Sequence, residues 1–350
     1  MAEEARHQVN RGGGASPLFV VDALGAMRVE FPPYYYTGGG IMNTVFKYMS
    51  FLGMDYFDNP TARISLIEEL NDPFECSLSD TIEHIIDVFV ERVNNPKLKE
   101  IDISDNNDIT REEVARFIFG AQRGIGVISF SETNRNLLMW AHYANNHRGI
   151  CIELESDWSK SKDRLIDTQS NNLHCFKRVQ YDTKRVDFSK HDFFKGNETH
   201  NVLSKLFIKQ LTLKSDEWMY EKEHRYIMSF LEADYILKKP ESTIPKDIEI
   251  KLKKLAAENN IIKEKNGYRT TDCQENEFFY EAFSSEAFMY LTKIPKDKIK
   301  SIYLGHRFKD TDAHELVNRV KFVEHPLHHV DIYKCAISYT RFELEIIKLY

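Results

Sequence analysis

The sequence predicts an α+β protein in which a mixed or antiparallel sheet forms the core and helices pack against it. Segments with alternating apolar residues, such as residues 150–155 (ICIELE), are typical of strands that are buried on one face. Other segments repeat their apolar residues at helical spacing, as residues 79–93 do after a Ser-Asp start that can cap a helix. Segments of both kinds occur along the chain, and this mixture favours the α+β class.

The order of the elements follows from these patterns and from the residues that end one element before the next begins. Strands are expected within residues 45–49, 62–66, 126–132, 150–155, 174–182, 293–308 and 328–349. Helices are expected over residues 79–93, 111–122, 137–147, 200–213 and 312–323. The helix at 137–147 is expected to stop at Gly149, because glycine is the usual left-handed residue after a helix. Residues 216–230 are expected to begin as a helix end and to continue as a strand.

We expect one catalytic α+β domain over residues 42–350. Residues 1–41 differ from the rest because two glycine triplets bracket a proline-containing segment, and we interpret them as an extension or an added segment. The alternative is a native arm that docks on the domain through Phe31 and Tyr34 to Tyr36. Residues 238–272 are polar, rich in lysine and weakly periodic, so a polar insertion is expected there.

Composition indicates a cytoplasmic protein. The 350 residues include no run of about 18 apolar residues, so no membrane contact is expected, and no secretion signal opens the chain. Five scattered cysteines without C-x-x-C spacing argue against a disulfide framework and a zinc site. The net charge of −7 does not indicate nucleic-acid binding, although residues 173–215 hold nine Lys or Arg against four Asp or Glu.

A dense group of aromatic and titratable side chains lies in residues 139–149 (MWAHYANNHRG). On a helix, Trp140, Tyr143 and His147 share one face. One interpretation is a half-buried helix whose aromatic stripe belongs to the core and whose polar residues face solvent. The other interpretation, which the density of the group favours, is the wall of a polar pocket that includes His142.

A second group lies in residues 218–225 (WMYEKEHR). On a strand, Glu221, Glu223 and Arg225 project to one face at steps of about 7 Å. Two neighbouring carboxylates repel each other when both are ionised, which raises the pKa of one, and an arginine beside them lowers it again. Such a pair suits the binding of a hydroxyl or the stabilisation of a developing cation. The alternative is an exposed strand with cross-strand charge pairs.

Two shorter patterns are candidates for ligand contacts. Ser129 and Ser131 point to the same side of a predicted strand, where they line a groove or merely cover a wet sheet face. The turn LNDPFEC contains Asn71 and Asp72, which either clamp a ligand or cap their own backbone. The sequence has no P-loop, G-x-S-x-G, H-E-x-x-H or G-x-G-x-x-G motif. No metal site is expected.

Five blocks together resemble a large bacterial family of domains of unknown function, numbered 2971. The blocks are FKYMS, LNDPFEC, ISFSETNRNLLMWAHYANNHRGICIELE, EWMYEKEHRYI and IKSIYLGHRF. The family pattern has K-Y-R, N-D-P-F-[ED], F-S followed by M-W-x-H-Y-x-x-x-H-x-G, W-x-x-E-x-E-[YW]-R and I-x-L-G-x-R, in this order. This chain departs from the pattern at Met49, where the family often has arginine, and Lys47 or Arg63 would substitute for that arginine.

The order of a basic or aromatic first strand, S-F-S and E-K-E is also similar to the R…S-T-S…E-x-E order of ADP-ribosyltransferases. This resemblance implies an ADP-ribosyltransferase-like fold and an enzyme that consumes NAD as its substrate. It implies that Glu223 is the catalytic carboxylate, which holds the ribose 2′-hydroxyl and stabilises an oxocarbenium-like transition state, and that Glu221 activates the acceptor. The residues expected to bind NAD are Lys47, Tyr48, Arg63, Ser129, Ser131, His142, Tyr143, His147 and Arg225.

By the same resemblance, the protein would be a bacterial toxin or an antiphage defence effector that modifies a protein or a nucleic acid. Basic residues 177–214 would dock this acceptor, and a cognate antitoxin would restrain the activity.

Two other function classes stay open. A hydrolase or nuclease would use His142, His147 and Glu223 as acid–base groups. A non-enzymatic sensor would hold a small nucleotide against Trp140, Tyr143 and His147. The pocket interpretation requires His142, His147, Glu221 and Glu223 to converge on one cavity.

Overall fold

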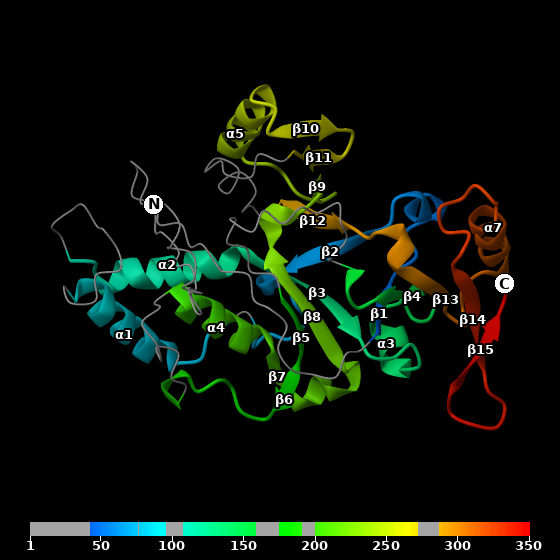
Figure 1. Cartoon of the computed structure of the whole chain (residues 1–350), viewed down its shortest axis with the longest axis horizontal. Helices are drawn as coiled ribbons and strands as arrows, with labels where there is room; N and C mark the ends of the chain where they lie inside the picture. Colours follow the sequence, from blue (N-terminus) through cyan, green and yellow to red (C-terminus); the bar gives the residue numbers. More distant parts are fainter. Residues whose placement is uncertain (1–42, 76, 96–107, 159–174, 191–199, 272–286) are drawn as a thin grey trace, which may run out of the picture.

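The computed structural model describes residues 43–75, 77–95, 108–158, 175–190, 200–271 and 287–350 (Figure 1). The extension expected over residues 1–41 lies outside these ranges. The strands are β1 (Thr44–Met49), β2 (Thr61–Leu66), β3 (Ile125–Ser131), β4 (Ile150–Glu155), β5 (Cys175–Arg178), β6 (Gln180–Asp182), β7 (Leu213–Ser215), β8 (Glu223–Ser229), β9 (Tyr235–Lys238), β10 (Ile261–Glu264), β11 (Gly267–Thr270), β12 (Phe288–Lys293), β13 (Ile299–Leu304), β14 (Asp331–Ile337) and β15 (Leu344–Lys348). The α-helices are α1 (Ile82–Asn94), α2 (Arg111–Arg123), α3 (Leu137–His142), α4 (His200–Leu211), α5 (Lys246–Ala257) and α7 (Asp310–Val320).

Most of these strands form one large sheet that divides at β3. Within the described ranges the sheet runs β10-β11-β9-β12-β2-β3-β1-β4-β13-β14-β15, and β8 pairs with both β3 and β5. One edge of β3 pairs with β8 from Ile125↔Ser229 to Ser131↔Glu223. The other edge pairs with β2 near its start and with β1 near its end. Among the described strands of this sheet, only β13 and β14 are paired in parallel, so the predicted α+β class with a mixed, largely antiparallel sheet is confirmed.

Helices α1, α2 and α4 lie together beside the β3–β8 pair (Figure 1). Ile85 and Phe89 of α1 and Ile118 of α2 are buried in one apolar cluster with Val127 of β3 and Ile227 of β8. The helical spacing of the apolar residues in α1 and α2 thus gives each helix one face to bury against the sheet. None of the helices that the structure describes is long and apolar enough to cross a membrane.

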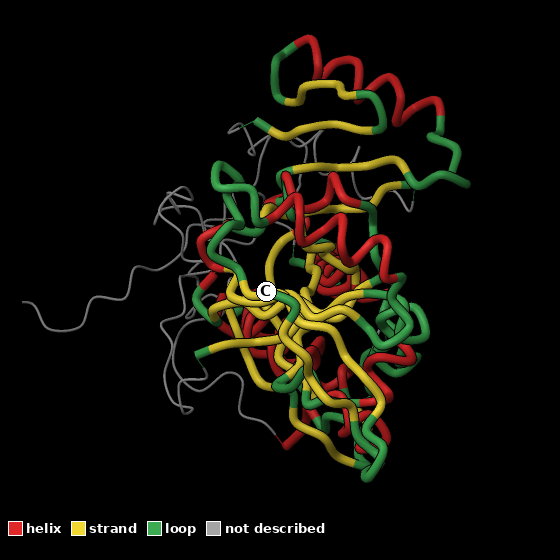
Figure 2. The backbone as a smooth tube through the Cα atoms, turned by 90° about the vertical axis from the view of Figure 1, so that its right-hand side faces the viewer, coloured by secondary structure: helices red, strands yellow, loops and turns green. Residues whose placement is uncertain are grey.

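Residues 238–272, expected to form a polar insertion, build regular structure. Helix α5 and strands β10 and β11 form there, and the strands extend the sheet beyond β9 into a lobe that projects from the rest of the molecule (Figure 2). Ile248, Leu252 and Leu255 of α5 are buried in the main core cluster. These three apolar residues stand among many lysines, which is why the helical periodicity is weak in the sequence although one apolar face exists.

Candidate functional site

One end of the β3–β8 pair carries a face of polar side chains. The register sets Ser129 opposite Arg225 and Ser131 opposite Glu223. Because side chains alternate along a strand and opposite residues share a face, these four side chains lie on the same face. Phe130 lies on the other face, in the main core. The predictions that the two serines share a face and that Glu223 and Arg225 share a face are therefore confirmed.

Arg225 is the centre of a buried cluster of charges. Its side chain is fully buried, and it donates from Nε to Oε1 of Glu223 at 2.8 Å and from Nη2 to Oε2 of Glu223 at 3.0 Å. It also donates to a carboxylate oxygen of Glu75 and, at 2.8 Å, to the backbone oxygen of Leu211. A charge in the protein interior needs such partners, because an unpaired one costs several kcal/mol.

Lys214 of β7 links the two glutamates of the E-K-E motif. Its buried ammonium lies 2.7 Å from Oε2 of Glu221 and 3.3 Å from Oε2 of Glu223. The same ammonium lies 4.6 Å from the centre of the Trp218 ring. One cation therefore holds both carboxylates in place, and an aromatic ring covers that cation.

The backbone around Glu221 differs from the strand that the sequence predicts. It ends a 3₁₀ helix, η5 (Asp216–Glu221), and the next residue, Lys222, has φ 46° and ψ 53°. Strand β8 begins only at Glu223. The prediction that both glutamates follow one strand is wrong, because this left-handed residue turns the chain between them. The hydroxyl of Ser131 holds the turn by donating to the backbone oxygen of Glu221 at 2.7 Å.

The helix predicted over residues 137–147 is also shorter than expected. Helix α3 ends at His142, and Asn145, Asn146 and His147 adopt φ values of 46°, 51° and 66°. Three successive left-handed residues without a glycine are unusual, because the Cβ atom of L-amino acids disfavours this region. They turn the chain sharply, so the side chains of residues 143–147 do not continue the helical face.

As a result, only part of the predicted pocket wall reaches the glutamates. The hydroxyl of Tyr143 donates to Oε1 of Glu221 and accepts a hydrogen bond of 3.1 Å from Nδ2 of Asn71. Burial and the nearby charge of Glu221 raise the pKa of Tyr143, so its hydroxyl stays protonated. His142 is exposed, and its ring lies 6.1 Å from that of Tyr220.

His147 lies apart from the charge cluster. Its ring stacks on Trp140 at 6.5 Å with an interplanar angle of 12°, and it meets the ring of His306 edge-on at 4.7 Å. The prediction that both histidines converge with the glutamates on one cavity is therefore wrong. The left-handed turn directs His147 toward His306, which follows β13, and His142 faces solvent.

Gly149 and Gly305 meet at this turn, where the backbone N–H of Gly305 donates to the oxygen of Gly149 at 3.0 Å. Gly149 does not adopt a positive φ, so its predicted role as a left-handed stop is wrong; instead, an added Cβ would collide with the backbone of Met49. A Cβ at Gly305 would collide with the backbone of His147. The backbone N–H of Arg307 donates to the oxygen of His147 at 3.0 Å. Both glycines are thus required by close backbone approach.

The charges of the cluster determine its ionisation. Burial alone would raise the pKa of Glu223, but the charges of Arg225 and Lys214, with hydrogen bonds from Arg225 and Ser129, lower that pKa to about 2. Glu75 behaves differently: burial raises its pKa despite the nearby Arg225 and Lys214. The repulsion expected to raise the pKa of one carboxylate does not do so at Glu223, which two cations contact.

Lys47 occupies the point where the sheet divides. Its ammonium donates to the backbone oxygen of Ser129 at 2.8 Å, on the edge of β3 where β1 and β2 separate. Burial lowers the pKa of Lys47, the charge of Glu223 opposes this shift and that of Arg63 adds to it, and together they bring the pKa to about 8. Lys47 therefore completes the hydrogen bonding of β3 and lies within electrostatic reach of Glu223.

Two other residues expected to bind NAD lie elsewhere. Tyr48 is buried against Trp140, 5.2 Å between ring centres, and its hydroxyl donates to the backbone oxygen of Thr133 at 2.8 Å. Arg63 lies on β2, where it forms a partly exposed ion pair with Glu69 at 2.9 Å. Tyr48 is thus a core residue of the α3 region, and Arg63 is a surface residue whose charge acts on Lys47.

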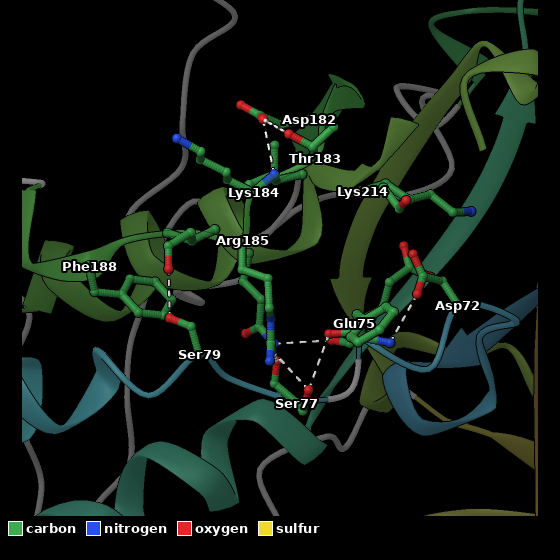
Figure 3. A pocket seen from close by; sticks show the side chains of 15 residues that line it. Asp72, Glu75, Ser77, Ser79, Asp182, Thr183, Lys184, Arg185, Phe188 and Lys214 are labelled. Carbon is green, nitrogen blue, oxygen red and sulfur yellow. Dashed lines mark hydrogen bonds between the residues drawn. The ribbon is translucent and has the colours of Figure 1, made fainter. Parts of the chain in front are cut away.

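A cavity of about 310 Å³ adjoins the charge cluster (Figure 3). Its lining includes Glu75 and Lys214, which also belong to the cluster, whereas Glu221 and Glu223 contact Lys214 but do not line the cavity. Oδ1 of Asp72 accepts from the backbone N–H of Phe74 at 2.9 Å, so the expected backbone cap forms. The residues that line the cavity are Asp72, Phe74, Glu75, Ser77, Ser79, Asp182, Thr183, Lys184, Arg185, Val186, Phe188, Gln210, Leu213, Lys214 and Ser215.

Two carboxylate oxygens of the cavity wall have no hydrogen-bond partner in the part of the chain that the structure describes. Oδ2 of Asp72 and Oε2 of Glu75 are buried and accept no hydrogen bond from any residue that the structure describes. A buried carboxylate oxygen normally has a partner, so these two atoms are available to a ligand. Within the described ranges, no three His, Cys, Asp or Glu side chains are placed to hold a metal ion.

The basic stretch 177–214 does not form one continuous docking face. Lys214 is buried in the charge cluster, and Arg178 pairs with Glu132 at 2.9 Å. Lys184 and Arg185 line the cavity, and Arg185 reaches across to Ser77 (Figure 3). The local excess of cations is therefore divided between the cluster and the cavity rim. Residues 191–199 of this stretch lie outside the described residues.

Sequence reasoning missed the residues that join the cluster to the cavity. Glu75 belongs to the LNDPFEC turn, three residues after Asp72, yet only the tertiary structure brings it to Arg225, 150 residues away. Lys214 is the last residue of the basic stretch that was expected to dock an acceptor, and the sequence does not link it to the E-K-E motif. The sequence held one signal for such residues. If an arginine and two glutamates are buried on one strand face, further charged side chains have to contact them.

Comparison with known proteins agrees with part of the family resemblance. The model of a family described as "Protein of unknown function (DUF2971)" matches residues 139–226. This segment runs from α3 to β8 and so contains the M-W-x-H-Y and E-K-E blocks. No curated protein and no solved structure gave a significant match to the chain.

Proposed function

We propose that the protein cleaves the nicotinamide–ribose bond of NAD, with the substrate bound in the cavity beside the charge cluster. The observation that carries this proposal is the distribution of charge on the cavity wall. Asp72 and Glu75 present carboxylate oxygens that have no partner among the described residues, and Lys184 and Arg185 stand on another part of the wall. Carboxylates suit a ribose that develops positive charge, and cations suit the pyrophosphate.

The chemistry requires few groups. The bond between C1′ of the ribose and the nicotinamide nitrogen breaks, and its electron pair leaves with nicotinamide. The oxygen of water, or an oxygen or nitrogen of an acceptor, attacks C1′ and loses its proton. In this proposal Asp72 takes the proton; the support is that its Oδ2 has no hydrogen bond within the described residues. Glu75, whose pKa is raised by burial, lies beside it.

Glu223 and Glu221 have supporting roles in this proposal. Each is only 3% exposed, and neither lines the cavity. Glu223 holds Arg225 and Lys214 in place, and Glu221 holds Lys214 and Tyr143. Direct contact between Glu223 and a ribose hydroxyl, which the resemblance to ADP-ribosyltransferases implies, would require Lys214 to move aside. A toxin or defence role follows only if NAD is consumed.

The test is incubation of the purified protein with NAD, and separately with NAD plus RNA, DNA or cell lysate, while nicotinamide release is followed by chromatography. Asp72→Asn and Glu75→Gln should each lower the rate at least about 100-fold, as expected for loss of an acid–base group. Glu112→Gln, which changes an exposed carboxylate on α2, is the matched control and should leave the rate unchanged.

The outcomes separate the possible sites. If nicotinamide is released and only Glu223→Gln abolishes the release, the substrate reaches the buried pair and the cavity is not the site. If the wild-type protein releases no nicotinamide with any acceptor, the proposed activity is wrong.

A second candidate function is a nucleotide-binding module without turnover. It is favoured by the fact that both buried carboxylates already accept hydrogen bonds within the protein. Glu221 accepts from Tyr143 and Lys214, and Glu223 accepts from Arg225 and Lys214. Ion pairs of this kind also serve purely structural roles. Binding of ADP-ribose with no nicotinamide release from NAD would support this function over the enzymatic one.

A further inference from the structure

Three aromatic side chains form a continuous strip next to the cavity. The rings of Trp218 and Tyr220 are 6.1 Å apart with an interplanar angle of 35°, and the ring of His142 lies 6.1 Å from that of Tyr220. The first two stand on η5 and the third ends α3, two elements that contact each other. The strip starts at Lys214, whose ammonium lies under Trp218 and whose side chain also lines the cavity.

The first ring of the strip, Trp218, lies outside the hydrophobic core, whereas Tyr220 packs on the edge of the cluster that contains Trp140. Trp218 is half-buried and belongs to none of the core clusters of the described residues, although tryptophan is the side chain with most to gain from burial. The ring nitrogens of Trp218 and His142 and the hydroxyl of Tyr220 have no hydrogen-bond partner among the described residues. Rings that are held side by side and remain accessible are suited to stack on another planar ring.

The cavity is too small for a whole dinucleotide. Its volume of about 310 Å³ is at the lower end of the range of roughly 300–1,000 Å³ for small-molecule sites. NAD consists of two nucleotides, so a cavity of this size encloses one of them and the other has to lie outside. The aromatic strip is one side chain, Lys214, away from the cavity wall.

We infer that Trp218, Tyr220 and His142 form a stacking subsite for the adenine base of the dinucleotide whose nicotinamide half occupies the cavity. This inference rests on the proposed function, because it assigns the second half of the same substrate. Lys214 connects the two halves: it is part of the cavity wall and the cation beneath the first ring of the strip.

The experiment compares two compounds by isothermal titration calorimetry on the full chain: ADP-ribose, which carries adenine, and nicotinamide mononucleotide, which does not. Trp218→Leu should weaken ADP-ribose binding by about 5- to 100-fold, the range that loss of one base-stacking ring produces. The same variant should change nicotinamide mononucleotide binding by less than about twofold. Trp218→Phe keeps a ring and should retain most of the affinity.

Tyr339→Leu is the matched control. Tyr339 is a fully exposed aromatic residue, and it is not among the residues that line the cavity. Equal weakening of both compounds by Trp218→Leu would overturn the inference, because Trp218 would then act only by holding Lys214. Unchanged ADP-ribose affinity in Trp218→Leu and Tyr220→Leu would overturn it as well. In either case, nicotinamide release by the wild-type protein still supports the proposed function. If the wild-type protein releases no nicotinamide and binds neither compound, both proposals are wrong.

Discussion

The two halves of the β3–β8 pair are equally buried, but for different physical reasons. In one half, Val127 and Ile227 are fully buried under apolar residues of α1, α2 and α4. In the other half, on the same face, Arg225 is fully buried and Glu223 is 3% exposed, and charged groups cover them instead. Burial alone therefore does not distinguish core from site in this protein.

The two halves should differ in how much stability the protein loses when a residue in them is substituted. The apolar half gains free energy roughly in proportion to the area removed from water, about 25 cal/mol per Å², so a small change in volume has a small effect. The charged half is stable only while each charge keeps its partner, because the desolvation of a lone buried charge is not compensated. A single substitution in the charged half should therefore cost more than a comparable one in the apolar half.

The largest effect is expected from Arg225→Met, which leaves Glu75 and Glu223 without their shared cation. The free energy of unfolding should fall by about 3–5 kcal/mol, the range for removal of one partner from a buried ion pair. Urea unfolding followed by circular dichroism measures this change. Arg123→Met, at an exposed site at the end of α2, should change the stability by less than about 0.5 kcal/mol. A loss below about 1 kcal/mol in Arg225→Met would contradict the charged state of the cluster.

A smaller effect is expected from acid. The pKa of Glu223 falls from an ordinary value of 4.5 to about 2 in the folded protein, so its ionised form stabilises the fold above pH 4.5. This contribution is lost as the pH falls toward 2, by about 2 kcal/mol at pH 3. Glu75 has a raised pKa and contributes with the opposite sign.

The measurement is the free energy of unfolding between pH 6 and pH 3 for the wild-type protein and for Glu223→Gln. The wild type should lose more stability than the variant over this interval, since only the wild type titrates at residue 223. Parallel pH profiles of the two proteins would show that Glu223 is not held ionised by the cluster.

The smallest effect is expected from Ile227→Val, which removes one buried methylene group from the apolar half of the same strand. The free energy of unfolding should fall by about 0.5–1.5 kcal/mol, with no dependence on pH between 6 and 3. The same urea titration tests it. If this variant were as unstable as Arg225→Met, the proposed difference between the two halves would not exist.

The candidate site was predictable from sequence where it depends on neighbouring residues in a regular element. Ser129 and Ser131 share a face, as do Glu223 and Arg225, because a strand alternates its side chains with a period of two. The prediction was wrong where a single backbone conformation interrupts the period. Lys222 separates Glu221 from β8, and three left-handed residues carry His147 away from the site. Lys222 carries no local signal of its turn, whereas Asn145, Asn146 and His147 belong to the non-glycine types that adopt positive φ most often, a weak signal that the helical pattern around them outweighed.

The sequence by itself determined the α+β class, the apolar faces of α1 and α2 and the polar face at the end of β8, since all of these follow from local hydrophobic periods. Only the tertiary structure decided which distant groups join that face. Glu75 and Lys214 come from separate segments, and the cavity exists because those segments meet beside β8. Buried charges select their partners by long-range contact and not by spacing along the chain, so their identity becomes visible only when the sheet and its connections are assembled.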